Sequence, residues 1–295
     1  MTLSVRPLHP LFAAEVTGLD LREATGAAAA REFEDVMDRC AVGVLPGQRI
    51  NDEQQLRFTR LFGELEVRPL QRGRNQVPDP SERIRHHEVF DVSNLDEKGK
   101  MLAPDDERRA YSIANRLWHT DSSFRQVSAT YSMLSGRVVP QEGADTEFAD
   151  LRAAWDALPD ALKARLEGLE AEHSIWHSRM TLGGYVPNEA ERLARPPARH
   201  PLVRVHPGSR RKTLYIASHM THVIGMDETE SRDLLDELMA FATQPRFVYA
   251  HKWRPFDLIV WDNRCTMHRA TPFDDTLQRR DMRRTTVREK AAAWA

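Results

Sequence analysis

The spacing of apolar and polar residues predicts a series of short elements in the first part of the chain. Apolar runs interrupted by proline and glycine predict strands within residues 3–22. Apolar side chains at helical spacing predict an amphipathic helix over residues 27–40. The uninterrupted apolar run at 42–45, followed by a Pro-Gly turn, predicts a short buried strand.

Capping residues predict a second helix after residue 50. Asn51 with Gln54 three positions later has the pattern of a capping box, in which each side chain bonds to the backbone of the other residue. Gly63 is the expected C-terminal stop. The apolar residues expected on the buried side of this helix are Leu56, Leu61 and Phe62.

Strands dominate the rest of the pattern, with two further helices between them. One helix is predicted over 151–172, broken near Pro159, and another from Asp227, with Glu230 in capping-box position. Apolar segments on both sides of Pro207-Gly208 predict a hairpin with a longer loop. The strands predicted in this part of the chain are 129–139, 146–148, 202–206, 214–217, 247–252, 257–262 and 283–288.

Two polar segments interrupt this order. In residues 68–112 the apolar periodicity fades, apart from a possible strand near 89–92, and we expect an active-site lid there. Residues 178–201, rich in proline and arginine, form a second expected insertion. Many short strands with few helices predict a mainly β fold with flanking helices: a jelly-roll, cupin-like double-stranded β-helix within a single domain, 1–295.

One pair of residues could bind a metal ion. His119 and Asp121 stand two positions apart in a run of strand-forming residues, and a strand would direct both side chains from the same face. One distant histidine would complete the two-histidine, one-carboxylate facial triad of non-haem Fe(II) oxygenases. His268 follows the apolar run 258–261 and is a candidate, 268 − 119 = 149 residues from His119.

Other histidine groups remain alternatives to this triad. The segment His86-His87-Glu88 also contains a histidine and a carboxylate two positions apart. His173 and His177 could share a helix face, as zinc-binding pairs do, and His219 and His222 are three positions apart. For each pair, a surface or hydrogen-bonded core position is the more common reading.

The motifs taken together resemble the TauD/TfdA family of Fe(II)- and 2-oxoglutarate-dependent dioxygenases. The resemblance extends through most of the chain, and within the family it is strongest to the 2,4-dichlorophenoxyacetate (aryloxyalkanoate) dioxygenases. It implies that His119, Asp121 and His268 hold Fe(II) and leave positions for 2-oxoglutarate and O₂. The segments that carry it are Trp118-His119-Thr120-Asp121, Gly143-Ala144-Asp145-Thr146, Trp261-Asp262-Asn263-Arg264 with His268, and Arg279-Arg280 with Arg284, besides the stretches 7–14 and 129–135.

The resemblance also implies binding residues for the two organic acids. Arg280 and Thr146 match positions that bind the distal carboxylate of 2-oxoglutarate, and a planar guanidinium suits that group. Arg284 and Asn115 match substrate-side positions, although Asn115 is as well explained as a turn or cap residue. The family's basic residue near position 70 has no secure counterpart here; the residues that could supply it are Arg68, Gln71, Arg72, Arg74 and Lys100.

Composition narrows the class of partner. The chain has 42 Lys and Arg against 44 Asp and Glu, so no basic excess points to nucleic acid, and no polybasic block points to a membrane. Two cysteines argue against a disulfide framework, and no apolar leader or spanning segment is present, so a cytoplasmic protein is expected. We expect a small anionic aromatic substrate and a homo-oligomer.

The resulting hypothesis is a dioxygenase of aryloxyalkanoic acids. It would hydroxylate the carbon beside the ether oxygen and give a phenol plus glyoxylate or pyruvate, with succinate and CO₂. The nearer alternative is the same chemistry on taurine, another alkylsulfonate or another small acid. The more distant alternative is a metal-binding jelly roll without oxidative activity.

Overall fold

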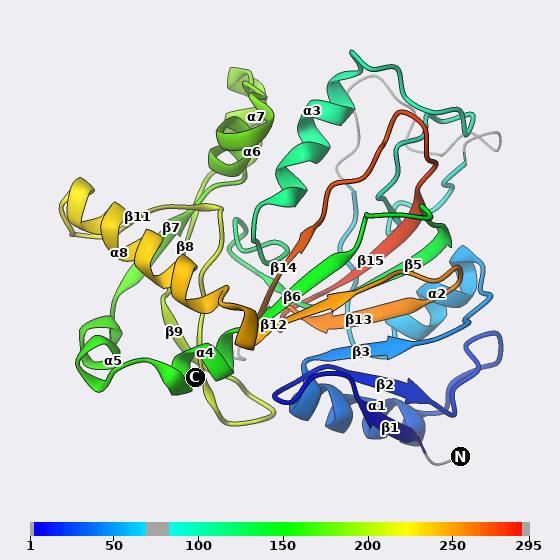
Figure 1. Ribbon diagram of the computed structural model, residues 1–295, viewed down its shortest axis with the longest axis horizontal. Helices are drawn as coiled ribbons and strands as arrows, with labels where there is room; N and C mark the ends of the chain where they lie inside the picture. Colours follow the sequence, from blue (N-terminus) through cyan, green and yellow to red (C-terminus); the bar gives the residue numbers. More distant parts are fainter. Residues whose placement is uncertain (1–2, 69–82, 291–295) are drawn as a thin grey trace.

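Four β-sheets flanked by helices make up the part of the chain that the computed structural model describes, residues 3–68 and 83–290 (Figure 1). The strands are β1 Ser4–Pro7, β2 Ala14–Thr17, β3 Val42–Leu45, β4 Phe90–Asp91, β5 Ala129–Val138, β6 Thr146–Asp150, β7 Glu170–His173, β8 Ala198–Pro201, β9 Val203–Val205, β10 Lys212–Leu214, β11 Met220–Val223, β12 Val248–His251, β13 Leu258–Asp262, β14 Thr266–Ala270 and β15 Asp281–Arg288. The helices are α1 Ala27–Cys40, α2 Asp52–Thr59, α3 Glu107–Ile113, α4 Leu151–Ala157, α5 Asp160–Leu166, α6 Ile175–Gly183, α7 Glu189–Ala194 and α8 Glu228–Ala242, with 3₁₀ turns η1 Ala114–Arg116 and η2 Pro245–Phe247.

A seven-stranded sheet in the order β1-β2-β3-β13-β5-β15-β4 forms the largest layer. Its neighbours pair antiparallel except β2 and β3, which pair parallel. Alternate residues of β13 and β5 point to opposite faces, as the pleat requires. On one face, Val260 and Met133 pack with Phe33 of α1 and Phe58 of α2.

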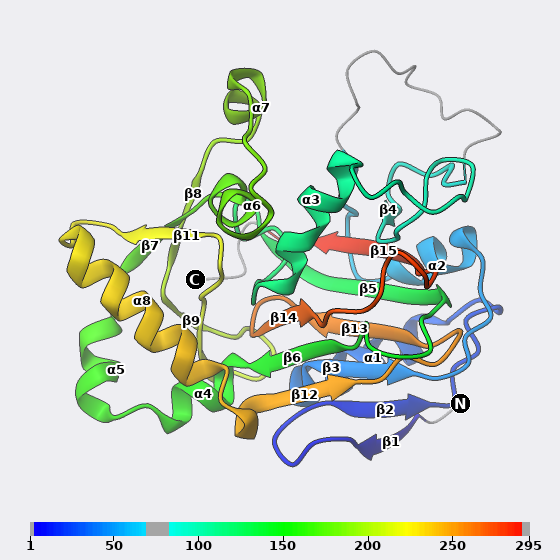
Figure 2. The ribbon, with the colours of Figure 1, turned by 45° about the horizontal axis from the view of Figure 1, so that its top comes forward.

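A three-stranded sheet, β12-β6-β14, lies against the other face of the large sheet (Figure 2). Phe148 of β6 shares a buried cluster with Ile259 and Trp261 of β13 and Met282 of β15. The next residue of β6, Ala149, belongs to a separate core with the helices α4 and α8. The small sheet is therefore buried on both faces, and its inner face meets the seven-stranded sheet.

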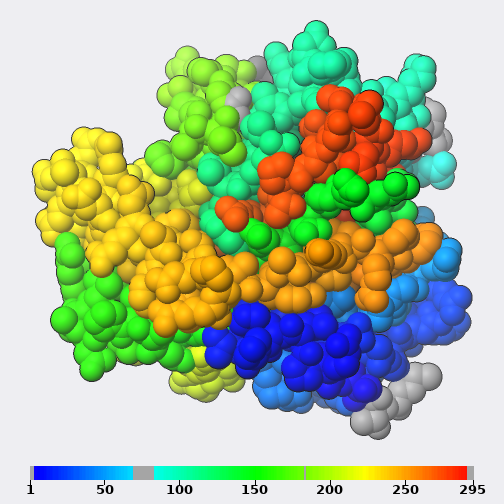
Figure 3. Space-filling view, viewed as in Figure 1, coloured from blue at the N-terminus to red at the C-terminus, as the bar shows by residue number. Residues whose placement is uncertain are grey.

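A lobe around α8 completes the fold. The helices α4, α5 and α8 contribute to one core with the strands β7 and β10, and Figure 3 shows α8 standing out at the left of the sheets. The strands β11, β7 and β8 form a sheet of their own, and β9 and β10 form a hairpin. In the described residues no helix is both long and apolar enough to cross a membrane.

Most elements predicted from the spacing are confirmed. The helix at 27–40 and the strand at 42–45 have the predicted bounds, and the reciprocal capping box of Asn51 and Gln54 is present. The helix after residue 151 breaks at Pro159, and the hairpin around Pro207 forms. Asp227 caps α8 by accepting from the backbone N–H groups of Thr229 and Glu230.

Some local predictions were wrong. Leu61 is 41% exposed, because α2 ends at Thr59 and the chain turns before it. Residues 170–172 belong to β7 rather than to a helix, since Gly168 adopts a positive φ and ends the helical segment. The predicted lid, 68–112, falls partly outside the described residues, which omit 69–82; its described part contains β4 and α3.

Candidate metal centre

The two histidines of the predicted triad are joined through their backbones. His119 donates to the carbonyl of His268 at 3.0 Å, and His268 donates to that of His119 at 2.7 Å. His268 stands in β14 opposite Phe148 of β6, so its side chain lies on the inner face of the small sheet. The two imidazole centroids are 4.2 Å apart. This antiparallel bridge brings together ligands that are distant in sequence.

Asp121 reaches the same point from a turn. The predicted strand around it was wrong: only His119 makes a bridge, and the chain turns from Asp121 onward, with a positive φ at Ser122. The backbone N–H of Asp121 donates to Asn263 Oδ1 at 3.1 Å, and Thr120 Oγ1 donates to the carbonyl of Asn263 at 2.8 Å. Side chains after β13 therefore fix the turn and direct the carboxylate inward.

One potential ligand atom from each of His119, Asp121 and His268 lies within 4.8 Å of the other two, and all three residues are buried. His119 Nδ1 lies 2.7 Å from the carbonyl of Leu117, so Nδ1 carries the hydrogen and the lone pair of Nε2 is unshared. His268 Nε2 lies 3.9 Å from Asp121 Oδ2. His268 Nδ1 is buried with no hydrogen-bond partner among the described residues.

The protonation states of these groups suit a divalent metal. Burial lowers the pKa of His119 to about 4 and that of His268 well below its usual value, so both imidazoles are neutral at neutral pH. Burial would raise the pKa of Asp121, but Arg284 and the two histidines outweigh it and lower the pKa to about 2. Two neutral imidazoles and one carboxylate match the donor set of a facial-triad iron site.

Two predicted binding arginines come from the segment around β15: Arg280 is buried, and Arg284 is partly exposed. Arg284 donates through Nη1 to Asp121 Oδ1, and its Nε has no partner among the described residues. Arg280, one residue before β15, donates through Nη1 to the carbonyl of Val92 at 3.0 Å. Burial lowers the pKa of Arg280 to about 10. Arg280 is thus a buried cation without a carboxylate partner in the described structure.

Each of the other two predicted binding residues accepts a hydrogen bond from another side chain. Thr146 Oγ1, at the start of β6, accepts from Trp253 Nε1 at 3.0 Å, which leaves its own hydrogen free to donate. Asn115 lies in the 3₁₀ turn η1, and its Oδ1 accepts from Arg179 Nη1 at 3.0 Å. Asn115 therefore holds a buried arginine that the sequence analysis did not identify.

A second buried group contains similar residue types. His206, Asp262 and Cys265 also bring potential ligand atoms within 4.8 Å of one another. Asp262 accepts from His206 Nε2 at 2.9 Å and from Arg264, whose Nε lies 2.8 Å from Oδ1. His206 Nδ1 accepts from the backbone N–H of Ser209 at 3.0 Å. Burial raises the pKa of Cys265 well above its usual value, so this second cluster offers a protonated thiol.

The alternative histidine pairs do not form metal sites in the described structure. His86 Nε2 contacts Glu53 Oε1 at 3.1 Å near the surface. Among the described residues, His86, His87 and Glu88 belong to no group of three potential metal ligands. His173 ends β7 whereas His177 lies in α6, so they do not share a helix face. His219 is buried, with its ring 5.8 Å from that of His119, and its Nδ1 bonds to Ser178 Oγ at 2.9 Å. His222 pairs with Thr221 instead.

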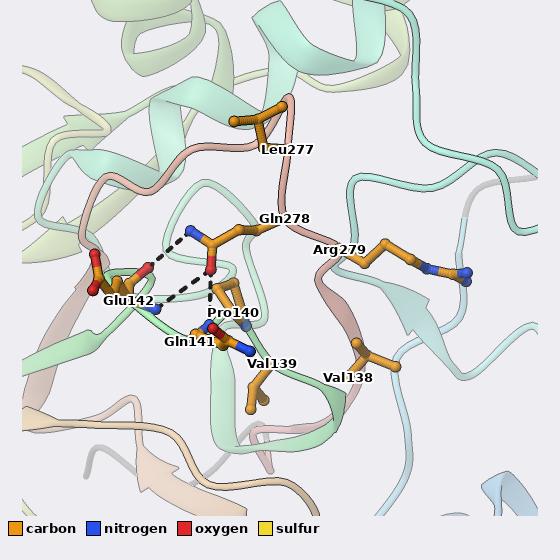
Figure 4. Close-up of a pocket in the computed structure, with 8 residues that line it drawn as sticks. All are labelled: Val138, Val139, Pro140, Gln141, Glu142, Leu277, Gln278 and Arg279. Carbon is orange, nitrogen blue, oxygen red and sulfur yellow. Dashed lines mark hydrogen bonds between the residues drawn. The ribbon is translucent and has the colours of Figure 1, made fainter.

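A surface hollow of about 490 Å³ lies away from this centre, between residues 138–142 and 277–279 (Figure 4). None of the predicted ligands lines it. Gln278 Oε1 accepts there from the backbone N–H of Gln141 at 2.8 Å and from that of Glu142 at 3.4 Å. These bonds fix the position of the segment that leads to Arg280. The hollow is thus connected to the predicted site through this segment.

Several residues around the centre escaped the sequence analysis. Ser132 Oγ donates to Asp121 Oδ2 at 2.7 Å, and Asn263 Nδ2 donates to Ser132 Oγ at 3.0 Å. Glu66 is buried nearby, and burial raises its pKa. Asn263 and Ser132 stand inside segments that carried the family resemblance, which was the available signal. The candidates Gln71, Arg72 and Arg74 lie outside the described residues, while Arg68 bonds to the backbone of residues 86 and 87.

Comparison with known proteins agrees with this geometry. The model of the family described as "Taurine catabolism dioxygenase TauD, TfdA family" matches residues 4–286. The chain is 47% identical over 291 residues to the alpha-ketoglutarate-dependent 2,4-dichlorophenoxyacetate dioxygenase of Cupriavidus pinatubonensis, covering 99% of each chain. It is 37% identical over 288 residues to the (S)-phenoxypropionate/alpha-ketoglutarate-dioxygenase of Sphingobium herbicidovorans, covering 93% of this chain and 91% of that one.

A solved structure supports the same relationship. The crystal structure of AAD-2 in complex with Mn(II) and N-oxalylglycine superposes with a TM-score of 0.88, at 45% sequence identity and with 98% of each chain covered. The likeness therefore extends over nearly the whole fold rather than over isolated motifs.

Proposed function

Because the chain belongs to the TauD/TfdA family and is a 2-oxoglutarate-dependent dioxygenase, we propose that it oxidises aryloxyalkanoic acids. The observations that carry this proposal are the buried triad of His119, Asp121 and His268 and the buried cation Arg280, which has no carboxylate partner among the described residues. The two relatives described above are named for 2,4-dichlorophenoxyacetate and for (S)-phenoxypropionate, both aryloxyalkanoates. Sequence identity over nearly the full chain supports extending that substrate class to this protein.

The proposed core is a double-stranded β-helix. The seven-stranded sheet and the sheet β12-β6-β14 would be its two walls. Their shared buried cluster, with Phe148 from one sheet and Ile259 from the other, supports this arrangement. The segments 68–112 and 178–201 would be insertions of this single domain, the first a lid over the centre.

We assign Fe(II) to His119, Asp121 and His268. His119 Nε2 has an unshared lone pair, and the ionised Asp121 supplies the negative charge, so the residues present fit the metal. When bound, Fe(II) and 2-oxoglutarate supply the activation of O₂. Asn263 and Ser132 would keep Asp121 oriented, as neighbours of metal ligands do in other proteins.

Arg280 and Thr146 would bind the distal carboxylate of 2-oxoglutarate. Arg280 has a buried guanidinium that donates to the backbone carbonyl of Val92 and has no carboxylate partner among the described residues, so a carboxylate would neutralise it. Thr146 has a hydroxyl hydrogen to donate to the same group, because its oxygen already accepts from Trp253. Buried charge-assisted bonds of this kind contribute about 1.5–3 kcal/mol each.

Arg284 would hold the carboxylate of the aryloxy acid. Its Nη1 is engaged with Asp121, while its Nε has no partner among the described residues, so the guanidinium has a donor left for a second acid. Fixing the acid would place the carbon beside the ether oxygen toward the metal. For phenoxyacetate, one oxygen atom of O₂ would enter that carbon and the other would enter succinate. The hydroxylated ether would then break into phenol and glyoxylate.

Anaerobic optical titration tests this proposal. The Fe(II) protein receives 2-oxoglutarate, then phenoxyacetate, or taurine in a parallel sample. We expect a weak visible metal-to-ligand band with 2-oxoglutarate and a further shift with phenoxyacetate. The absence of a band would favour the alternative hypothesis, a metal-binding jelly roll without oxidative activity. A shift with taurine and none with phenoxyacetate would indicate that the substrate is an alkylsulfonate.

An Arg280→Met variant sharpens the titration. It should require roughly 10- to 100-fold more 2-oxoglutarate to develop the band while keeping its metal, because only the distal carboxylate loses a partner. Arg279→Met is the matched control, since Arg279 lines the surface hollow instead. Equal effects of the two substitutions would contradict the role of Arg280.

A further inference from the structure

Arg179 is a second buried arginine near the metal centre. It lies in α6, is 8% exposed, and donates through Nη1 to the carbonyl of Tyr111 at 2.9 Å and to Asn115 Oδ1 at 3.0 Å. Its guanidinium also lies over the ring of Tyr111, 4.3 Å from the centroid. Its Nε is buried without a hydrogen-bond partner among the described residues. Nη1 of the side chain is thus bound to two acceptors, while the Nε hydrogen remains available to a further acceptor.

The position of Arg179 next to the triad follows from a chain of contacts. The ring of His119 is 5.8 Å from that of His219, and His219 Nδ1 bonds to the hydroxyl of Ser178 at 2.9 Å. Ser178 is the residue before Arg179 in α6. On the other side, the 3₁₀ turn that carries Asn115 leads directly into the segment of His119. Figure 2 shows α6 next to α3 above the end of β14.

Arg179 interacts electrostatically with the charged groups of the centre. Burial lowers its pKa, Tyr111 raises it, the positive charge of Arg284 lowers it further, and Asp121 raises it. Arg179 in turn helps to lower the pKa of His119 and of His219. Arg179 and Arg284 therefore repel each other, and Asp121, which attracts Arg179, already accepts a hydrogen bond from Arg284.

Arg179 is a buried cation without a carboxylate partner in the described structure. It forms no ion pair with any described carboxylate; its Nη1 donates to a carbonyl and to an amide oxygen, and the guanidinium also hydrogen-bonds to the side chain of Tyr111. A buried guanidinium without a counter-charge is costly unless an anion arrives. Arg280 shows the same pattern, but the distal carboxylate of 2-oxoglutarate accounts for that residue. Arg179 needs a separate anion.

We propose that Arg179, positioned by Asn115, binds the carboxylate of the organic substrate together with Arg284. This inference rests on the proposed function and adds a residue to its substrate site. The acid group would be held between an arginine on α6 and an arginine on β15, two elements from opposite sides of the centre. Asn115 then acts as a positioning residue through Arg179.

Equilibrium binding to the oxygen-free complex with Fe(II) and 2-oxoglutarate tests the proposal. Calorimetry would compare phenoxyacetate with phenoxyacetamide, a neutral molecule of nearly the same shape. In Arg179→Met, the affinity for phenoxyacetate should fall roughly 10- to 100-fold, as expected for a buried charge-assisted bond. The affinity for phenoxyacetamide and the 2-oxoglutarate titration should stay within about threefold, because neither involves that bond.

Two further variants guard against a merely structural effect. Arg179→Lys keeps the charge and should recover part of the loss, and Asn115→Ala should weaken acid binding less than Arg179→Met. Arg195→Met is the matched control. Arg195 bonds to the hydroxyl of Tyr111 at 3.3 Å and lies over Trp176, so its loss loosens the same contact between α3 and α6 without removing Arg179. That control should leave both affinities unchanged.

The outcomes separate the two levels of the hypothesis. An equal loss for the acid and the amide, or no loss for either, would assign Arg179 to packing and overturn the inference. If Arg179→Met does not fold, the affinities of Arg179→Lys and Asn115→Ala for the acid and the amide are compared instead. A loss for the acid alone supports the inference, and an equal loss for both, or no loss, overturns it. Failure of the wild-type protein to bind phenoxyacetate would overturn the substrate class instead, whatever the variants show.

Discussion

The triad and the second cluster are two buried groups of similar composition with different chemistry. Each combines histidine and aspartate with a third potential ligand, and each brings its ligand atoms within 4.8 Å. In the triad, Nε2 of His119 has an unshared lone pair. In the second cluster, both ring nitrogens of His206 are engaged, and Arg264 covers the carboxylate of Asp262.

The comparison shows that proximity and burial alone do not define a metal site. A ligand must offer a lone pair that no protein hydrogen already occupies, and it must reach the deprotonated state. His119 and Asp121 satisfy both conditions. In the second cluster, hydrogen bonds use the lone pairs and Cys265 keeps its proton. The second cluster instead supports the triad, since Asp262 immediately precedes Asn263, which bonds to the backbone of Asp121.

Removing a ligand from the triad should have the largest effect. His268→Ala should abolish turnover and stoichiometric Fe(II) binding, because two ligands hold the metal too weakly. Metal content after dialysis and succinate formation are the measurements. His222→Ala is the control, since His222 lies in β11, opposite Glu172 of β7, and its Nδ1 bonds to Thr221 Oγ1. Full metal content in His268→Ala would contradict the assignment of His268.

Asp262→Asn should instead cost stability while leaving the metal bound. It leaves the buried Arg264 without the carboxylate of Asp262 and removes the negative charge that His206 Nε2 contacts, which destabilises by about 3–5 kcal/mol. Urea unfolding of the metal-free protein measures this loss. Asp156→Asn, in an exposed ion pair with Arg211, should cost less than about 1 kcal/mol. Loss of metal from folded Asp262→Asn would show that the second cluster takes part in binding.

The same variant has a pH signature. Burial would raise the pKa of Asp262, but Arg264 and His206 outweigh it and hold the pKa far below the usual 3.8. The stabilisation is therefore fully present above the unfolded pKa and is lost as the pH falls toward the folded one. The difference in unfolding free energy between wild type and Asp262→Asn should narrow below about pH 4.

Asn263→Ala should give an intermediate effect on the metal. It removes the acceptor for the backbone N–H of Asp121 and the donor to Ser132, so the carboxylate loses orientation. We expect a metal affinity roughly 10- to 100-fold weaker, measured by competition with a chelator. Asn188→Ala, at the cap of α7, is the control. An unchanged metal affinity would show that Asn263 does not contribute to metal binding by orienting Asp121.

Cys265→Ala should have the smallest effect. The thiol is buried and protonated, so its loss should cost about 1 kcal/mol of stability. The metal affinity should be the same as in the wild type, by the same chelator competition. A weaker affinity would mean that the thiol is a ligand after all.

Local pattern predicted much of the fold because its elements carry their own signals. The helix at 27–40 has a regular apolar face, and Asn51 has its capping partner three residues away. The sheet β11-β7-β8 escaped prediction because its buried positions are filled by residues such as Ala171, His173 and Ala198, which give no strand alternation. Burial of His173 depends on tertiary packing that no local window contains.

The candidate site shows the same limit. The spacing of His119 and Asp121 selected two residues that the structure brings together, but the predicted strand does not exist. The backbone bridge to His268 places His119, and a turn held by Asn263 directs Asp121 inward. Arg179 was missed because its significance comes from what lies beside it in space. Nothing in the sequence around α6 distinguishes a buried arginine that lacks a carboxylate partner from a solvated one.

The backbone bridge between His119 and His268 also sets when the site can exist during synthesis. The ribosome must add 268 − 119 = 149 residues after His119 before its partner appears. At ordinary speeds of about 5–20 residues per second this takes roughly 7–30 s. Until then the nascent chain holds only His119 and Asp121 of the triad. If the proposed triad holds the iron, the metal binds only after translation has passed β14, and a metal-loaded centre requires that the two sheets have already packed together.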